Sequence, residues 1–371
     1  MIYADNASTT KLDMDAFEAM KPFLIEEYSN PSQSYSFSRK VKTALKEARE
    51  DIAECINALP EEIFFTSGGT ESDNWAIKGV ALNDYSKKAI ITSEIEHHAV
   101  LNSCQMLEGL GYPVAYLPSD SSGGVAADKL KQYIHNASLV SIMHANNEIG
   151  TIQPISELSE IAHEHNAYFH TDAVQTVGHI PIDVKSLNVD MLSASAHKFN
   201  GPRGIGFLYI KKGTKLIPLL NGGAQESEMR AGTENVAAIV AMAKALKNNC
   251  INVERNIEHI RAVSNAFLSN LSVDYLLNGS EQRLYGINSI SFKNMSGESL
   301  LHVLDLKGFC VSTGAACDSV NTQISHVLHA IKVPDEYAEG TIRVSFGKYN
   351  TEEEAIKLAE AINEIVKMKR N

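Results

Sequence analysis

Short apolar runs alternate with amphipathic stretches as far as residue 210, and this alternation most limits the folds open to the chain. Helical patterns such as PISELSEIAHEHN separate runs of the strand type. The runs are 88–94, 138–145, 167–172, 189–196 and 204–210. Parallel strands need long crossover connections, usually helices, and are buried on both faces. The alternation therefore predicts an α/β fold with a mostly parallel central sheet covered by helices.

A longer helical stretch, 234–262, follows these runs and is predicted to bridge to a second lobe. With 371 residues, 44% of them hydrophobic, the chain is long enough for two lobes. We predict a large domain over 15–250 and a smaller α+β domain formed by 1–14 and 251–371. The smaller domain ends in the amphipathic segment TEEEAIKLAEAINEIVKMKR.

The charge balance narrows the classes of partner. The formal net charge is −12 and the pI is about 5.6, so nucleic acid and anionic membranes would repel the protein. No apolar run reaches the length of a signal-peptide core or a membrane span. We therefore expect a cytoplasmic protein that acts on small molecules or proteins. An odd number of scattered cysteines, five in all, predicts reduced thiols.

Polar clusters follow predicted strands, at the sheet edge where ligands bind in folds of this class. TSGGTESDN, 66–74, opens a helix, so Gly69 and the amides near Thr70 suit an anion. A plain glycine turn with Thr70 as its N-cap explains this motif equally well. In HTDAVQ, Asp172 follows a strand, where a carboxylate can pair with a protonated ring nitrogen or cap a helix.

Two further clusters supply a lysine and a histidine. SASAHKFNGPRG places Lys198 at a strand end, where a desolvated lysine can form a Schiff base. Taken alone, a surface lysine is the commoner interpretation. EIEHHAV supplies His97, whose ring can stack on a cofactor, move protons, or form a hydrogen bond at a helix start. Together the four clusters contain the parts of a pyridoxal phosphate site.

The chain resembles the first class of cysteine desulfurases, which are fold-type I pyridoxal phosphate enzymes. The likeness runs from YADNASTT to TIRVSFGKYNTEEE, essentially the whole chain. Its most specific pieces are NNEIGTIQPI, TDAVQ, SAHKFNGPRG, RAGTEN and STGAAC. The resemblance implies pyridoxal 5'-phosphate as cofactor, L-cysteine as substrate and a homodimer.

The resemblance also implies roles for single residues around the cofactor ring. Lys198 would hold the cofactor as a Schiff base and move the substrate α-proton. Asp172 would keep the ring nitrogen protonated, and Gln175 would hydrogen-bond the phenolic oxygen. His97 would lie over the ring.

Further roles implied by the resemblance concern the phosphate and the substrate. Thr233 would reach the phosphate of the neighbouring subunit, so that the site exists only in a dimer. Asn147 and Arg343 would hold the substrate carboxylate, which a guanidinium fork suits. The phosphate ligands from the same chain would be Gly69, Thr70, Ser195 and His197.

Cys317 lies among small residues in VSTGAACDSVNTQ, which predicts a mobile surface loop over about 311–325. The resemblance makes Cys317 the thiolate that takes sulfur from L-cysteine, leaving a persulfide and alanine. A loop would carry this sulfur to an acceptor such as an iron-sulfur cluster scaffold, a tRNA-thiolation protein or a dedicated partner. An incidental exposed thiol is the alternative interpretation.

Departures from the family's pattern avoid the positions with implied roles. They include Ala4, Lys11, Ala224, Asp318 and Ile324. The last two follow the reactive cysteine and leave open which acceptor docks there. Two other functions also stay open: an aminotransferase or selenocysteine lyase that does not need this cysteine, and a scaffold without turnover.

The histidines of IAHEHNAYFH, which are His163, His165 and His170, carry no predicted metal site. His163 and His165 fall at a predicted helix end, where a solvated polar face explains them better than a metal. We expect no metal in this protein. Cys310 lies in an apolar strand pattern that predicts a core position.

Overall fold

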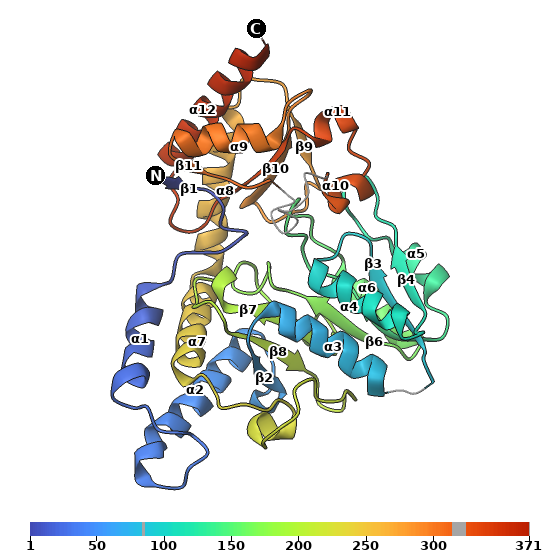
Figure 1. Cartoon of the computed structure of the whole chain (residues 1–371), viewed down its shortest axis with the longest axis vertical. Helices are drawn as coiled ribbons and strands as arrows, with labels where there is room; N and C mark the ends of the chain where they lie inside the picture. The colour runs from blue at the N-terminus through green and yellow to red at the C-terminus, as the bar shows by residue number, and fades with distance from the viewer. Residues whose placement is uncertain (84–85, 314–323, 371) are drawn as a thin grey trace.

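The computed structural model describes residues 1–83, 86–313 and 324–370. Figure 1 shows a large sheet with its helices in the lower part of the view and a smaller sheet with its own helices above. No helix within the described ranges has both the length and the apolar character needed to cross a bilayer.

A seven-stranded sheet forms the centre of the larger part, in the order β2-β8-β7-β6-β5-β3-β4. Its strands are β2 (Ile63–Thr66), β3 (Ala89–Ser93), β4 (Val114–Leu117), β5 (Ala137–Ser141), β6 (Tyr168–Asp172), β7 (Met191–Ser195) and β8 (Gly206–Ile210). Neighbouring strands are parallel except at β8, which is antiparallel to both β2 and β7. The predicted α/β fold with a mostly parallel sheet is confirmed.

Helices bury both faces of this sheet. Ile90 belongs to a core with residues of α3 and α4, whereas its neighbour Ile91 belongs to a core with residues of α2, α5, α6 and α7. This alternation is expected because successive strand side chains point to opposite faces. The helices of the larger part are α1 (Met14–Ile25), α2 (Arg39–Cys55), α3 (Gly69–Asn83), α4 (His98–Gly109), α5 (Ala127–Tyr133), α6 (Ile155–Glu164) and α7 (Val236–Ile251).

The helical stretch predicted over 234–262 is two helices. α7 ends at Ile251, and α8 (Val253–Ser269) begins after Asn252, whose φ of −108° and ψ of 14° are not helical. In Figure 1, α8 runs from the lower part of the molecule into the upper part. The single stretch predicted from sequence was therefore wrong at this break.

The upper part contains a three-stranded antiparallel sheet, in the order β12-β10-β9. Its apolar core includes Phe267 of α8, Phe292 and Ile342. The remaining elements are β1 (Ile2–Tyr3), β9 (Leu276–Asn278), β10 (Ile287–Ser291), α9 (Gly297–Leu306), β11 (Phe309–Cys310), α10 (His326–Ala330), α11 (Asp335–Ala338), β12 (Thr341–Ser345) and α12 (Glu352–Arg370). The domain boundaries proposed from the sequence remain a prediction.

The N-terminal segment joins the two parts. Ile2 and Tyr3 of β1 pair in parallel with Phe309 and Cys310 of β11. A few residues later, Thr10 donates its hydroxyl to the His197 carbonyl beyond the end of β7. Short 3-10 turns complete the structure at Ser36–Ser38, Pro60–Glu62, Ala196–Lys198 and Gln225–Glu228.

Candidate active site

A cavity of about 660 Å³ opens at the carboxyl ends of the central strands. Its lining comes from the residues that follow β2, β3, β5, β6 and β7, together with the N-terminal segment and β12. The residues with predicted roles that line it are Gly69, Thr70, His97, Asn147, Asp172, Gln175, Ser195, His197, Lys198 and Arg343.

The start of α3 forms a narrow cradle in this cavity. Gly68 has φ of 150°, and a Cβ atom added at Gly69 would lie 2.6 Å from a methyl group of Val174. The first amides of a helix have no intrahelical acceptor, so this close backbone can bind an anion. Ser195 and His197 line the same cavity, and burial lowers the pKa of His197 to about 4, which leaves its ring neutral at neutral pH.

Asp172 ends β6 and is buried, with Oδ1 accepting from the Val174 amide at 2.9 Å. Burial raises the pKa of Asp172, although His97 and Lys198 act against this shift. Asp73 is also buried, and burial together with Asp172 raises its pKa. Two such carboxyl groups favour a cation between or beside them, such as a protonated ring nitrogen.

Lys198 ends the short turn after β7. Its side-chain amine and its main-chain carbonyl both form hydrogen bonds. Its Nζ donates to the carbonyl of Ala7 at 2.6 Å and to that of Ser8 at 2.8 Å. Its own carbonyl accepts from Nε2 of His179 at 2.8 Å. The amine is therefore fixed at the cavity wall by the N-terminal segment.

His97 is the N-cap of α4, as the hydrogen-bonding interpretation of its motif predicts, and it also lines the cavity. Its Nδ1 accepts from the Ala99 amide at 3.1 Å, which requires the proton of the neutral ring to sit on Nε2. Burial lowers the pKa of His97. The neutral ring therefore has one N–H donor that the helix cap does not use.

Arg343 lies in β12, buried against the N-terminal segment. Its NH2 group donates to Oδ1 of Asp5 at 3.0 Å and to the hydroxyl of Ser8 at 2.6 Å, and NH1 donates to the Asn147 carbonyl at 2.8 Å. Nε is buried and has no acceptor among the residues described. A buried donor of this kind calls for an anionic or polar ligand.

Cys317 lies outside the described residues, but the chain on either side of it is anchored beside the cavity. Upstream, Ser312 and Arg343 exchange both of their backbone hydrogen bonds, at 3.1 Å and 2.6 Å. Downstream, the Ser325 hydroxyl donates to Oε2 of Glu148 at 2.6 Å, next to Asn147. Both anchors are therefore attached to residues adjoining or forming the cavity wall.

The class-V aminotransferase family pattern matches residues 2–358. The chain is also 51% identical to the cysteine desulfurase IscS of Dictyoglomus turgidum, over 100% of this chain and 95% of that protein. The chain belongs to the cysteine desulfurase family. A solved structure of a NifS-like protein covers 99% of both chains with a TM-score of 0.94 and 39% identity. Another, described as SspA in complex with cysteine, covers 95% of this chain and 100% of its own, with a TM-score of 0.86 and 35% identity.

Thr233 does not line the cavity of this desulfurase-family chain, and its side chain is exposed. Sequence reasoning missed Asp5, Ala7 and Ser8, which contact Arg343 or the Lys198 amine. They belong to YADNASTT, a stretch noted for its resemblance to the cysteine desulfurases but given no roles. Two of these contacts use main-chain carbonyls, which any residue type provides.

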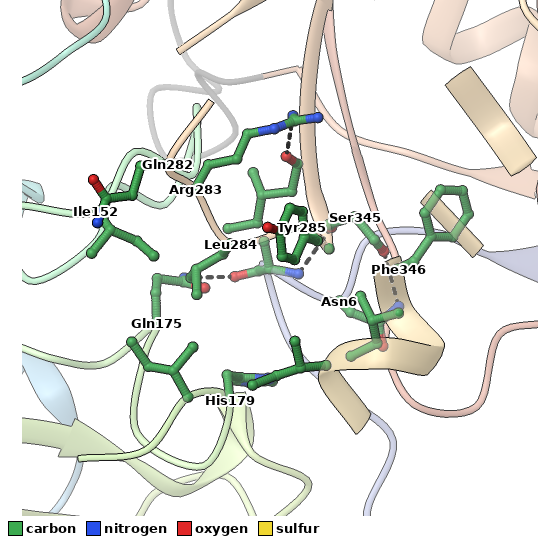
Figure 2. A pocket seen from close by; sticks show the side chains of 16 residues that line it. Asn6, Ile152, Gln175, His179, Gln282, Arg283, Leu284, Tyr285, Ser345 and Phe346 are labelled. Atoms are coloured by element: carbon green, nitrogen blue, oxygen red, sulfur yellow. Dashed lines mark hydrogen bonds between the residues drawn. The ribbon is translucent and has the colours of Figure 1, made fainter. Parts of the chain in front are cut away.

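A second cavity, of about 290 Å³, lies behind Ala7 and Gln175, which line both cavities. Figure 2 shows apolar side chains such as Ile152 and Leu284 in its wall. The two basic side chains in its lining donate to main-chain carbonyls. Arg283 donates to the carbonyl of Ile287, and His179 donates to the carbonyl of Lys198. The clustered acid, amine and imidazole groups therefore belong to the first cavity.

His163 and Cys310, both singled out from the sequence, do not line the first cavity. His163 lies in α6, with Nε2 at 2.7 Å from Oδ2 of Asp190. No three histidine, cysteine or acidic side chains in residues 1–83, 86–313 and 324–370 form a group suited to a metal. Cys310 lies in β11 but is partly exposed, so the core position predicted for it was wrong.

Proposed function

We propose that this protein is a pyridoxal phosphate-dependent cysteine desulfurase that converts L-cysteine to L-alanine and keeps the sulfur as a persulfide on Cys317. The observation that carries the proposal is one cavity lined by Lys198, Asp172 and Arg343, beside which Ser312 and Ser325 anchor the chain on either side of Cys317. The relationship to IscS proteins, and to a structure described as bound to cysteine, supports the choice of substrate.

The residues present fit the cofactor. The glycine cradle at the start of α3 suits a phosphate, and the buried acid pair suits a protonated pyridine nitrogen. Lys198 would hold the cofactor covalently, and Gln175 and His97 would contact its ring. When bound, pyridoxal phosphate supplies an aldehyde for amines and a ring that withdraws electrons from the substrate α-carbon.

The protein's own groups would bind the substrate and move its protons. Arg343 has a buried Nε available for the substrate carboxylate, and Asn147 adjoins it. Lys198 would take the α-proton once its amine is free. His97 would donate from Nε2 toward the reacting atoms, because its Nδ1 already accepts a hydrogen bond from the Ala99 amide of α4.

Sulfur transfer then needs only the thiolate of Cys317. Its Sγ would attack the sulfur of the substrate, so that an S–S bond forms as the substrate C–S bond breaks. The three-carbon remainder takes up protons and leaves as alanine, and no external oxidant is required. An acceptor protein would later take the outer sulfur by attack of its own thiolate.

The test is the Cys317→Ser variant supplied with pyridoxal phosphate and L-cysteine. It should keep the visible cofactor spectrum and its change on adding cysteine, but release neither alanine nor sulfide above background. A thiol with a pKa near 8.5 supplies a few per cent thiolate at neutral pH, whereas a serine hydroxyl supplies almost none. Sulfide release at the parent rate would instead favour a lyase that does not need Cys317.

A second variant, Lys198→Ala, tests the cofactor link. It should bind some pyridoxal phosphate through the phosphate and ring contacts, yet borohydride should fix no cofactor to the protein. Alanine formation should be lost. Normal turnover by Lys198→Ala would contradict the proposed site, and an unmodified protein that forms no alanine from L-cysteine would contradict the proposed function.

A further inference from the structure

The first turn of α10 contacts both segments that supply functional residues to the cavity. Ser325, the N-cap of α10, donates its hydroxyl to Oε2 of Glu148 at 2.6 Å. His326 Nε2 donates to the carbonyl of Glu96 at 3.0 Å. Glu96 directly precedes His97, and Glu148 directly follows Asn147. Ser325 and His326, at the start of α10, therefore each contact the neighbour of a predicted site residue.

Buried hydrogen bonds also join these two segments to each other. Oε1 of Glu96 accepts from the Met143 amide at 3.0 Å, and Asn146 Nδ2 donates to the Ile95 carbonyl at 2.9 Å. Asn146 Oδ1 accepts from the Glu148 amide at 2.8 Å. Because Glu96 and Asn146 are fully buried, water does not compete for these bonds.

Apolar packing fixes α10 against the same two segments. Val327, Leu328 and Ile331 are buried in a cluster with side chains from both segments. Those side chains are Ile95, Met143 and Ile149. The ring of His326 also meets the ring of His98 edge-on, with centroids 4.9 Å apart. The helix is short, but burial of three aliphatic side chains holds it in place.

We propose that Ser325 and His326 are positioning residues, which hold the segments around His97 and Asn147 in place. Ser325 fixes the chain after Asn147, and His326 fixes the carbonyl before His97. The inference rests on the proposed function, since it assumes that His97 and Asn147 act on the substrate. Ser325 follows residue 323 by two positions. The start of α10 therefore connects the chain that carries Cys317 to both segments.

Two single variants separate the two contacts. Ser325→Ala removes the hydroxyl next to Asn147, so KM for L-cysteine should rise by roughly threefold to tenfold with little change in kcat. His326→Ala removes the bond next to His97, so kcat should fall by a similar factor with little change in KM. Ser325→Thr keeps the hydroxyl and should restore the parent KM. His329→Ala, at an exposed position of α10, is the matched control.

Hydrogen-deuterium exchange supplies a readout that does not depend on turnover. In the cofactor-free and the loaded protein, Ser325→Ala should speed exchange in peptides covering 146–150, and His326→Ala in peptides covering 96–101. His329→Ala should change neither. Parent exchange and parent kinetics in both variants would overturn the proposal.

Two other outcomes are also decisive. If kcat and KM change together in both variants and the melting temperature falls with them, α10 only stabilises the fold and the positioning role is wrong. If the parent protein forms no alanine from L-cysteine, the proposed function fails. The exchange data would then still decide whether α10 braces the two segments.

Discussion

At the scale of single residues, the carboxyl of Glu96 is in an unusual environment. It is fully buried, and burial raises its pKa to about 8, although hydrogen bonds from Ser93 and the Met143 amide act in the opposite direction. Its Oε2 has no hydrogen-bond partner in the described part of the chain. At neutral pH the native protein therefore holds this carboxyl in its protonated form.

Glu96→Gln should stabilise the cofactor-free protein by an amount that grows with pH. From about pH 4.5 the unfolded chain ionises at Glu96 while the folded chain stays protonated, so the parent loses stability as pH rises to about 8. Glutamine does not titrate. The advantage of the variant should grow by at most about 1.4 kcal/mol per pH unit and become constant above pH 8.

Urea unfolding at several pH values measures this difference. The exposed Glu360→Gln on α12 is the control, and it should follow the pH dependence of the parent, because water hydrates that carboxylate in both states. A constant difference between Glu96→Gln and the parent at every pH would show that Glu96 is ionised in the folded protein.

Sequence reasoning at this scale located side chains better than main-chain groups. Lys198, Asp172 and His97 were predicted from strand-end motifs, and all three line one cavity. The carbonyls of Ala7 and Ser8, which hold the lysine amine, were not predicted because a carbonyl has no residue-type signature. Their position depends on a pairing between distant parts of the chain.

At the scale of elements, the turn before α7 contains three consecutive residues with left-handed backbones. Glu226, Ser227 and Glu228 have φ of 47°, 56° and 67°. Arg49 holds this turn by a bidentate ion pair with Glu226, at 2.9 Å and 2.6 Å. Each non-glycine residue in this conformation costs about 1 kcal/mol or more.

Glu228→Gly should therefore stabilise the protein, by about 0.5–1 kcal/mol after the greater flexibility of glycine in the unfolded chain is subtracted. Glu228 is exposed, so no packing is lost. Glu339→Gly is the matched control, because it is also exposed but has φ of −63°, and it should destabilise the protein. Thermal and urea unfolding measure both. If both substitutions change the free energy of unfolding equally, the backbone of Glu228 is not strained.

The five predicted runs match β3, β5, β6, β7 and β8 to within a few residues. They do not include β2 or β4, and the direction of β8 and one helix break were not predicted. An apolar run such as that of β8 has the same pattern in either direction, so its antiparallel pairing with β7 had no signal. The break at Asn252 lies in a continuous helical pattern, NNCINVERN. Asparagine is typical of helix ends, but the apolar spacing on both sides outweighed that signal.

At the scale of the whole molecule, the proposed dimer can be tested through Thr233. Thr233 is exposed and lies outside the cavity of its own chain. If it reaches the neighbour's phosphate, Thr233→Asp should inactivate the neighbouring site, because a carboxylate repels a phosphate. An equal mixture of Thr233→Asp and Lys198→Ala chains should regain roughly a quarter of parent activity, since half of the dimers have one intact site of two.

Subunit mixing needs a control in which each of the two sites of the mixed dimer carries one lesion. Lys198→Ala mixed with Asp172→Asn should stay inactive, because both residues line the cavity of the same chain. Alanine formation after dissociation and reassembly is the measurement. An active protein that sediments as a monomer, or equal recovery in the two mixtures, would exclude a role of Thr233 in a neighbouring site.

The ion pair between Asp5 and Arg343 joins two residues that are synthesised far apart in time. During translation the aspartate is made 338 positions before its arginine partner. At about 5–20 residues per second, the ribosome needs roughly 20 to 70 seconds to cover that interval. The lysine amine and the glycine cradle are synthesised well before it ends. If Arg343 binds the substrate carboxylate as proposed, a nascent chain lacks that guanidinium until β12 is made, and chemistry on free cysteine cannot begin before then.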